Sequence, residues 1–215
     1  MRGAFITIEG GEGVGKSTSL AAVEATLRDL GHTVVTTREP GGTQLGEQVR
    51  SLILDGRHEG LKPETEVLLM FAARAQHLAD VIRPALERGD WVLCDRFTDA
   101  TMAYQGGGRG LPVEFIADLE ARVQRGLRPD LTLLLDAPAA VGYQRIRDRE
   151  LDHFEREGLE FLERVRQAYL EIAEREPERV EVVDASASPE AVAAALSARV
   201  RRFAGRFEPD TMAVG

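Results

Sequence analysis

The chain has 215 residues, of which 43% are hydrophobic and 29% charged, a composition typical of a globular protein rather than a disordered or fibrous one. Acidic residues outnumber basic ones by 36 to 27, and the net charge of −9 argues against nucleic acid and acidic membrane surfaces as partners. One cysteine allows no internal disulfide, and no apolar run is long enough to span a membrane, so we expect a cytoplasmic protein.

Short β-prone runs alternate with longer amphipathic stretches along the chain. The expected strands cover 5–8, 33–37, 91–94, 131–135 and 180–183. The expected helices, in which apolar residues recur every three or four positions, include 20–30, 45–54 and 63–88. Strands of four or five residues separated by helices predict a five-stranded parallel sheet with helices on both faces, an α/β fold of three layers.

The organisation along the chain predicts one domain. There is no internal repeat and no linker rich in proline and serine, so a single domain is expected to span 1–215. Residues 205–215 are expected to form a loosely held C-terminal tail.

A glycine-rich segment follows the first expected strand and matches every fixed position of the phosphate-loop pattern G-x-x-x-x-G-K-[ST]. Backbone N–H groups of such a loop surround phosphate oxygens, Lys16 reaches the β- and γ-phosphates, and the Ser17 hydroxyl binds Mg²⁺. A glycine-rich turn at a helix start is the alternative. The residues expected to hold ATP are Gly10, Gly11, Glu12, Gly13, Val14, Gly15, Lys16, Ser17 and Thr18.

The phosphate loop indicates a nucleoside triphosphate with magnesium but not the acceptor. A GTPase normally recognises guanine through an Asn-Lys-x-Asp loop, and this chain contains no asparagine. A DNA-translocating ATPase would need a basic track, which the net charge opposes. A kinase for a small phosphate-bearing substrate is therefore favoured.

Two arginines support that choice because they follow strands. Arg38 ends the second strand and Arg96 follows the third, so both are expected beside the phosphate loop at the carboxyl edge of the sheet. Their guanidinium groups suit a second phosphate, although structural salt bridges are an alternative for each.

Two further segments have alternative interpretations. Phe71 and Arg74 share a helix face and could stack and hydrogen-bond a base, but their spacing alone favours a core phenylalanine and a solvated arginine. The tract 104–110, YQGGGRG, predicts a tight loop whose backbone approaches a ligand, with a flexible linker as the alternative.

At this point the sequence resembles bacterial thymidylate kinases (dTMP kinases), a family of P-loop nucleoside monophosphate kinases. The matching segments are IEGGEGVGKST at 8–18, TREPGGTQLGEQVR at 37–50, LLMFAARAQHL at 68–78, DRFTDATMAYQGGGRG at 95–110 and RPDLTLLLDAP at 128–138. The resemblance implies phosphorylation of dTMP to dTDP by ATP with Mg²⁺, and a homodimer formed through helices.

The resemblance also implies roles for individual residues. Glu12 would accept a hydrogen bond from the 3′-hydroxyl of dTMP, Phe71 would stack on thymine, and Arg74 would bond its O4. Thr101 and Gln105 would lie beside the base, while Tyr104 would crowd the place of a ribose 2′-hydroxyl. Arg38 and Arg96 would hold the acceptor phosphate, with Arg50 as a weaker candidate, and Asp95 would help place Mg²⁺ or the donor phosphate.

A lid arginine is expected on the same grounds, because the interior of the phosphate loop contains none. The lid would cover about 142–157, with Arg149 as the first choice to act on the transferring phosphate and Arg147 and Arg156 as the next. This chain has His153 where some relatives carry arginine, and Ala100 where many carry serine. Two alternatives remain: a kinase for a different deoxynucleotide, and a nucleotide-binding regulator that has lost turnover.

Overall fold

The computed structural model describes residues 2–54, 61–146 and 152–207. Five strands form one parallel sheet in the order β2-β3-β1-β4-β5. The strands are β1 (Phe5–Gly10), β2 (Val34–Arg38), β3 (Trp91–Asp95), β4 (Leu131–Asp136) and β5 (Val180–Asp184). The predicted fold class and all five predicted strands are therefore confirmed: four begin at the predicted residue, β2 begins one residue later, and each ends one or two residues later than predicted.

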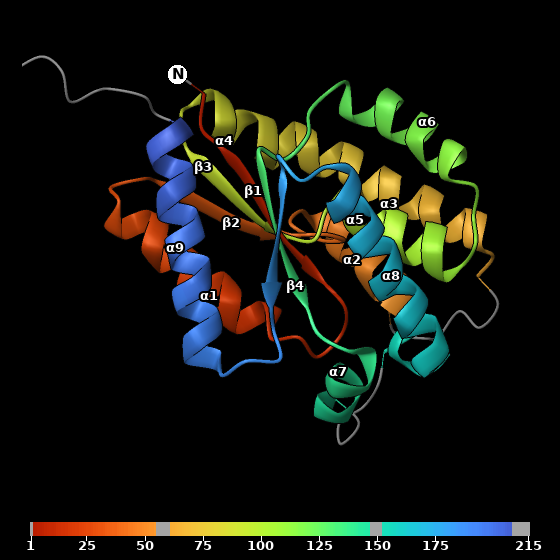
Figure 1. Cartoon of the computed structure of the whole chain (residues 1–215). Coiled ribbons are helices and arrows are strands. Elements are labelled where there is room, and N and C mark those ends of the chain that lie inside the picture. Colours follow the sequence, from red (N-terminus) through yellow and green to blue (C-terminus); the bar gives the residue numbers. More distant parts are fainter. Residues whose placement is uncertain (1, 55–60, 147–151, 208–215) are drawn as a thin grey trace, which may run out of the picture.

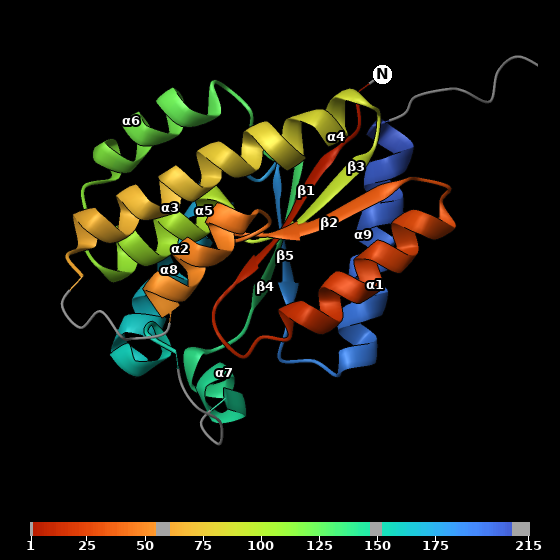
Figure 2. The same ribbon diagram turned by 180° about the vertical axis from the view of Figure 1, so that it is seen from behind.

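Helices cover both faces of the sheet (Figures 1 and 2). On one face lie α1 (Lys16–Asp29) and α9 (Pro189–Phe207). The other face carries α3 (Pro63–His77), α4 (Arg83–Glu87), α5 (Thr98–Thr101) and α8 (Leu159–Arg175), and α2 (Gln44–Leu54) and α6 (Val113–Gln124) pack against α3. The short α7 (Ala139–Ile146) lies beyond the carboxyl ends of the strands.

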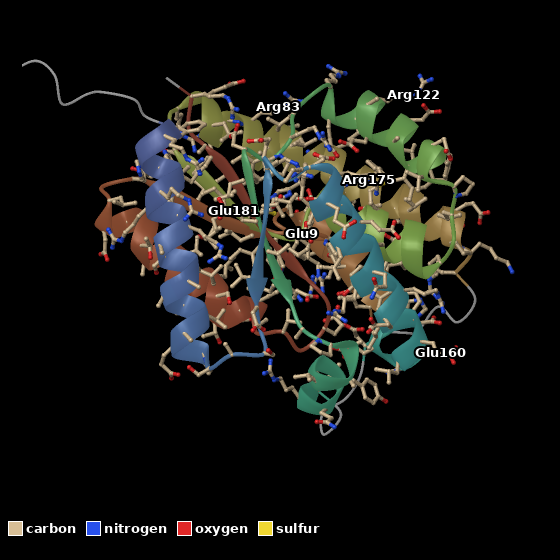
Figure 3. The ribbon with its side chains drawn as sticks, viewed as in Figure 1. Glu9, Arg83, Arg122, Glu160, Arg175 and Glu181 are labelled. Carbon is tan, nitrogen blue, oxygen red and sulfur yellow. The ribbon has the colours of Figure 1, made fainter. Side chains whose placement is uncertain are left out.

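The two sides of β1 differ in character because alternate residues point to opposite faces of a sheet. Ile6 and Ile8 are buried in the apolar core beneath α1 and α9. Thr7 and Glu9 are equally buried but polar, and they face the other layer. Figure 3 shows Glu9 near the centre of the molecule, whereas Arg122 and Glu160 lie on its outside. A buried polar layer therefore runs up to the phosphate loop.

The helix predicted over 63–88 is interrupted by a wider turn. A π-helical stretch, Leu78–Ile82, joins α3 to α4, and Pro84 follows in the first turn of α4. Proline has no N–H to donate to the preceding turn, so a locally wider helix accommodates it. The chain continues in nearly the same direction (Figure 2).

The glycine tract is helical, which corrects the predicted loop. Met102–Gly108 forms a second π-helical stretch. A Cβ on Gly107 would lie 2.5 Å from the Cβ of Ala168, and one on Gly108 would lie 2.5 Å from the Phe161 ring. These glycines therefore allow α8 to approach closely, a packing requirement rather than a contact with a ligand.

The C-terminal segment begins differently from the predicted tail. Residues 205–207 belong to α9, and the Phe207 ring meets Trp91 edge-on at 5.5 Å between ring centroids. Residues 208–215 lie outside the described residues. Within the described ranges no helix combines the length and apolarity that crossing a membrane requires.

Candidate active site

A cavity of about 520 Å³ opens at the carboxyl ends of the strands. The phosphate loop, the segment after β2, α2, α3, the end of β3, residues 100–105 and the segment 152–155 all contribute to its wall. Segments far apart in the sequence meet here because parallel strands end at one edge of the sheet.

The phosphate loop has the backbone that its glycines predict. Gly13 and Gly15 have φ of +68° and +88°, in the left-handed region that favours glycine. A Cβ on Gly13 would lie 2.1 Å from the carbonyl oxygen of Gly142 in α7, so the loop and α7 pack backbone against backbone. Position 13 therefore needs glycine for two reasons.

Lys16 is folded onto its own loop. Its Nζ donates to the carbonyl oxygens of Gly11 at 2.6 Å and Gly10 at 3.3 Å. Burial and the nearby charge of Arg96 lower the pKa of Lys16 below its ordinary value. The ammonium thus sits within the phosphate loop and is held by acceptors that a phosphate could replace.

Arg96 lies at the centre of the site. Its φ of +67° is unusual for a residue with a side chain, and this backbone turn directs the chain away from β3. Its guanidinium donates to the Glu12 carboxylate at 2.6 Å, the Gly10 carbonyl at 2.8 Å and the Tyr104 hydroxyl at 2.9 Å. Burial alone would lower the pKa of Arg96, but the Tyr104 and Glu12 oxygens offset that effect and raise it well above its usual value.

Glu9 supports this turn from the sheet. One carboxylate oxygen accepts the backbone N–H of Phe97 at 2.6 Å, and the other accepts the Tyr169 hydroxyl at 2.8 Å. Burial, followed by the charge of Asp99, raises the pKa of Glu9 to about 7. Tyr169 also accepts a hydrogen bond from Arg96, so the Tyr169 hydroxyl links Glu9 to that guanidinium.

Asp95 and Ser17 form the candidate magnesium site. Asp95 lines the cavity, and its Oδ1 is buried without a hydrogen-bond partner among the described residues. Ser17 is exposed on the same wall. No group of three His, Cys, Asp or Glu residues in the described ranges is placed to hold a metal. That arrangement suits Mg²⁺, which is usually held by one or two protein oxygens together with substrate phosphates and water.

Arg74 is buried at the opposite end of the cavity, contrary to the solvated position that spacing alone favours. Its side chain is 2% exposed. Nε donates to Glu39 at 2.7 Å and Nη2 donates to Thr101 at 2.9 Å. Nη1 is buried and has no hydrogen-bond partner within the described ranges. Arg74 lines the cavity, and a buried nitrogen without a partner among the described residues is a candidate contact for a ligand bound there.

Phe71 is not among the residues that line the cavity, and its expected stacking on the base stays a prediction. Its ring lies 4.7 Å from the Arg74 guanidinium carbon and packs with Val67 and Ile116. Met70, one position earlier, lines the cavity in its place. The reason is helical geometry, since neighbouring residues on a helix point about 100° apart. A polarisable thioether in the wall can pack against a flat ring.

The two arginines expected to hold the acceptor phosphate beside Arg96 differ in their position: Arg38 ends β2 and Arg50 belongs to α2. Arg38 is half-exposed, does not line the cavity and pairs with Glu47 at 2.7 Å. Arg50 lines the cavity and donates to the Pro40 carbonyl at 3.2 Å. Burial lowers the pKa of Arg50 below its usual value, with a smaller effect from the charge of Arg38. Arg50 is thus the better placed of the two for an anion in this cavity.

The remaining predicted residues meet in one wall. Glu12, Thr101, Tyr104 and Gln105 all line the cavity. The Tyr104 hydroxyl donates to Glu12, and burial raises the pKa of Tyr104 well above its usual value. Gln105 donates to the buried Glu66 at 2.7 Å, which fixes the orientation of its amide.

The lid is only partly described. Arg147 and Arg149 lie outside the described residues, and Arg156 is exposed on the short 3₁₀ turn Glu155–Glu157 and does not line the cavity. Arg145, which the sequence did not single out, lines the cavity and donates to the carbonyl oxygens of Gly13 and Ala185, each at 3.3 Å.

A second cavity of about 260 Å³ lies on the other side of the phosphate loop. Arg145 and Thr18 belong to both cavities, and the segment from Ala185 to Pro189 completes the second one. The phosphate loop therefore separates two adjoining spaces.

This arrangement defines a class of protein. A phosphate loop at the end of a parallel sheet, with its lysine in one cavity and a buried arginine at the far end of that cavity, is the site of a P-loop nucleotide kinase. The model of the Thymidylate kinase family matches residues 8–196. The chain belongs to the thymidylate kinase family.

Known relatives agree with that assignment. The thymidylate kinase of Pseudomonas putida (strain GB-1) is 62% identical over 193 residues, which cover 89% of this chain and 92% of the relative. The thymidylate kinase of Chromohalobacter salexigens is 58% identical over 201 residues, 92% of this chain and 95% of the relative. The crystal structure of thymidylate kinase from Ehrlichia chaffeensis is 32% identical, with a TM-score of 0.74 over 94% of this chain and 98% of that one.

Proposed function

We propose that the chain transfers the γ-phosphoryl group of ATP to dTMP and forms ADP and dTDP. The observation that carries this function is one cavity that holds Lys16 at one end and, at the other, Arg74, whose Nη1 has no hydrogen-bond partner among the described residues. A nucleoside monophosphate presents the matching groups, an anionic phosphate and a base with a carbonyl oxygen.

The base end of the cavity suits thymine. Nη1 of Arg74 would donate to O4, while Met70 and Phe97 supply apolar wall. Gln105, held by Glu66, would face an edge of the base, and Tyr104 would close the space that a ribose 2′-hydroxyl needs. Glu12 would accept from the 3′-hydroxyl.

The phosphate end suits two anions brought into contact. The acceptor phosphate loses its second proton near pH 6, so its oxygen is already a nucleophile at neutral pH and needs no general base. The protein must instead offset repulsion between the two phosphates and stabilise the charge of the transfer. Lys16 would hold the donor phosphates, and Arg96 and Arg50, with Arg38 at the rim, would hold the acceptor phosphate.

Mg²⁺ fits the oxygens of Ser17 and Asp95. Bound there, it would neutralise part of the negative charge of the donor phosphates. Asp95 contributes a buried carboxylate oxygen that lacks a partner among the described residues, and Ser17 contributes an exposed hydroxyl.

The second cavity would receive the rest of ATP, because it adjoins the phosphate loop on the side away from Arg74. Arg145 lies between the two cavities and is a candidate for contact with the transferring phosphate beside Arg149, Arg147 and Arg156. Its position over Gly13 supports the idea of an arginine supplied by the lid segment.

The protein would act as a homodimer with one domain per chain, in the cytoplasm. Exposed apolar side chains on neighbouring helices support an interface there: Leu45 of α2, Leu68 of α3 and Val113 of α6 are 43%, 50% and 47% exposed. An assembly that covers them would bury apolar surface at little cost.

A coupled ADP-release assay tests the function. Purified protein is given ATP and Mg²⁺ with dTMP, dUMP, UMP, dCMP or dGMP in turn, and Lys16→Ala serves as the inactive control. The highest kcat/KM is expected with dTMP. Preference for any other monophosphate would overturn the assignment of the substrate.

A further inference from the structure

Four polar side chains, linked by hydrogen bonds, lie behind the base end of the cavity. Arg74 Nε donates to Glu39 Oε2 at 2.7 Å, Glu39 Oε1 meets His77 Nδ1 at 3.0 Å, and His77 Nε2 meets Thr37 Oγ1 at 2.7 Å. Glu39 follows β2, Thr37 belongs to β2, and both arginine and histidine come from α3. These hydrogen bonds therefore tie the position of Arg74 to the sheet.

The chemistry of each link sets its direction. A carboxylate paired with a guanidinium accepts hydrogen bonds, so the proton of the second link belongs on His77 Nδ1. In the neutral imidazole with that tautomer, Nε2 accepts, and the Thr37 hydroxyl donates to it. Thr37, His77 and Glu39 are then satisfied without water, and Arg74 keeps one nitrogen, Nη1, without a partner among the described residues.

The four linked side chains are closely enclosed. His77 is 0% exposed and Glu39 is 6% exposed. A Cβ on Gly42 would lie 2.5 Å from both His77 Nε2 and Thr37 Oγ1, so the loop after β2 closes directly over that link. On its other side, the Arg74 guanidinium carbon lies between the rings of Phe71 and Phe97, at 4.7 and 4.8 Å from their centroids.

The consequence is that one nitrogen of Arg74 is left without a partner among the described residues, and its direction is fixed. Glu39 takes Nε and Thr101 takes Nη2, which leaves Nη1. A carbonyl oxygen opposite Nη1 completes the hydrogen bond. An amino group at the same place, as in dCMP, would set donor against donor and leave both unsatisfied, which is costly in a buried site.

We propose that His77 is a specificity-positioning residue: through Glu39 it holds Arg74 so that the site accepts a base with a carbonyl oxygen at that edge and rejects one with an amino group. The inference rests on the proposed function and deepens it. His77 does not line the cavity, so it acts only through Glu39.

Two substitutions at the same position separate this role from simple packing. In His77→Asn the amide nitrogen branches where Nδ1 does, so it can still donate to Glu39. In His77→Gln the amide lies one bond farther out, so it can reach Thr37 but no longer Glu39. His32→Gln, at a histidine that stacks on Trp91 remote from the cavity, is the matched control.

The measurement is kcat and KM for dTMP and for dCMP in wild type and the three variants, with thermal unfolding of each. We expect His77→Gln to lower the ratio of kcat/KM for dTMP over dCMP by about tenfold, mainly through KM for dTMP. We expect His77→Asn to retain most of the wild-type ratio and His32→Gln to retain all of it.

The outcomes distinguish failure of the positioning role of His77 from failure of the proposed function. A His77→Gln protein with the wild-type ratio, or equal losses in the Asn and Gln variants, would overturn the positioning role. A lower unfolding temperature with an unchanged ratio would likewise assign His77 to packing alone. A wild type without preference for dTMP over dCMP would overturn the proposed function and the positioning role with it.

Discussion

The base end of the cavity and its phosphate end are built differently. At the base end, Arg74 is 2% exposed, is held from the sheet through Glu39, and keeps one nitrogen without a partner among the described residues. At the phosphate end, each cation that lines the cavity is engaged by an oxygen of the protein: Lys16 by loop carbonyls, Arg96 by Glu12 and Arg50 by the Pro40 carbonyl.

The difference follows from the charge of what each end would bind. A neutral base can be recognised by a donor that is fixed in advance, although a buried donor without a partner costs about 1–3 kcal/mol until the base binds. Several cations in one place repel each other, so each is stabilised by a nearby acceptor until an anion replaces it. The base end therefore selects the base, whereas the cations of the phosphate end exchange protein oxygens for those of a bound anion.

The largest effect is expected from Lys16→Ala. It removes the cation of the phosphate loop, so kcat should fall about a thousandfold or more, while the dissociation constant for dTMP without ATP stays near the wild-type value. Steady-state kinetics and calorimetry measure the two. The only other lysine in the chain supplies the control, because Lys62→Ala lies at the exposed start of α3 and should change neither. Equal loss of dTMP affinity and turnover in Lys16→Ala would place Lys16 at the base end instead.

The buried carboxylate behind the phosphate end should make stability depend on pH. Glu9 ionises near 4.5 in the unfolded chain, whereas the fold keeps it protonated to about pH 7. The unfolded state therefore binds fewer protons between these values, and the free energy of unfolding should fall by up to about 3 kcal/mol as pH rises across them. Glu9→Gln resembles the protonated form and should remove this fall.

Urea unfolding at pH 5, 6, 7 and 8 checks this expectation. The free-energy difference between Glu9→Gln and wild type should shift in favour of the variant as pH rises. Glu174→Gln, an exposed glutamate of α8, is the matched control and should follow wild type. Parallel curves for Glu9→Gln and wild type would contradict the raised pKa.

A smaller effect, on KM for dTMP, is expected from substitution of Arg38 or Arg50. Arg50 lines the cavity and Arg38 does not, so Arg50→Ala should raise KM for dTMP about tenfold and Arg38→Ala by about threefold or less. Initial rates at saturating ATP measure both. A larger effect at Arg38 would show that binding brings it into the cavity and that Arg50 serves structure.

The smallest effect concerns the exposed partner of Arg38. Glu47→Gln weakens the pair and leaves Arg38 more available to an anion, so KM for dTMP should fall by about twofold while kcat is unchanged. The effect should shrink at high salt, because the pair is half-exposed. A rise in KM would mean that Glu47 serves mainly to shape the loop through Gly42, whose N–H it accepts at 3.0 Å.

The parts of the site that the sequence predicts are the local ones. The phosphate loop is a contiguous pattern of backbone requirements, and the strand ends place Arg38, Asp95 and Arg96 at one edge of the sheet. The burial of Arg74 is harder to predict from the sequence, because it depends on Glu39 and Thr101, which lie 35 and 27 positions away. Phe71 and Met70 are neighbours, and only the packing of α3 decides which of the two reaches the cavity.

The structure of the protein with dTMP bound tests the central claim most directly. At the base end, the Arg74–Glu39–His77 contacts should be unchanged, with Nη1 of Arg74 donating to O4. At the phosphate end, Arg96 should have exchanged its contact with Glu12 for one with the acceptor phosphate. Rearranged base-end contacts together with an unmoved Arg96 would contradict the division of the cavity into an end that selects and an end that exchanges.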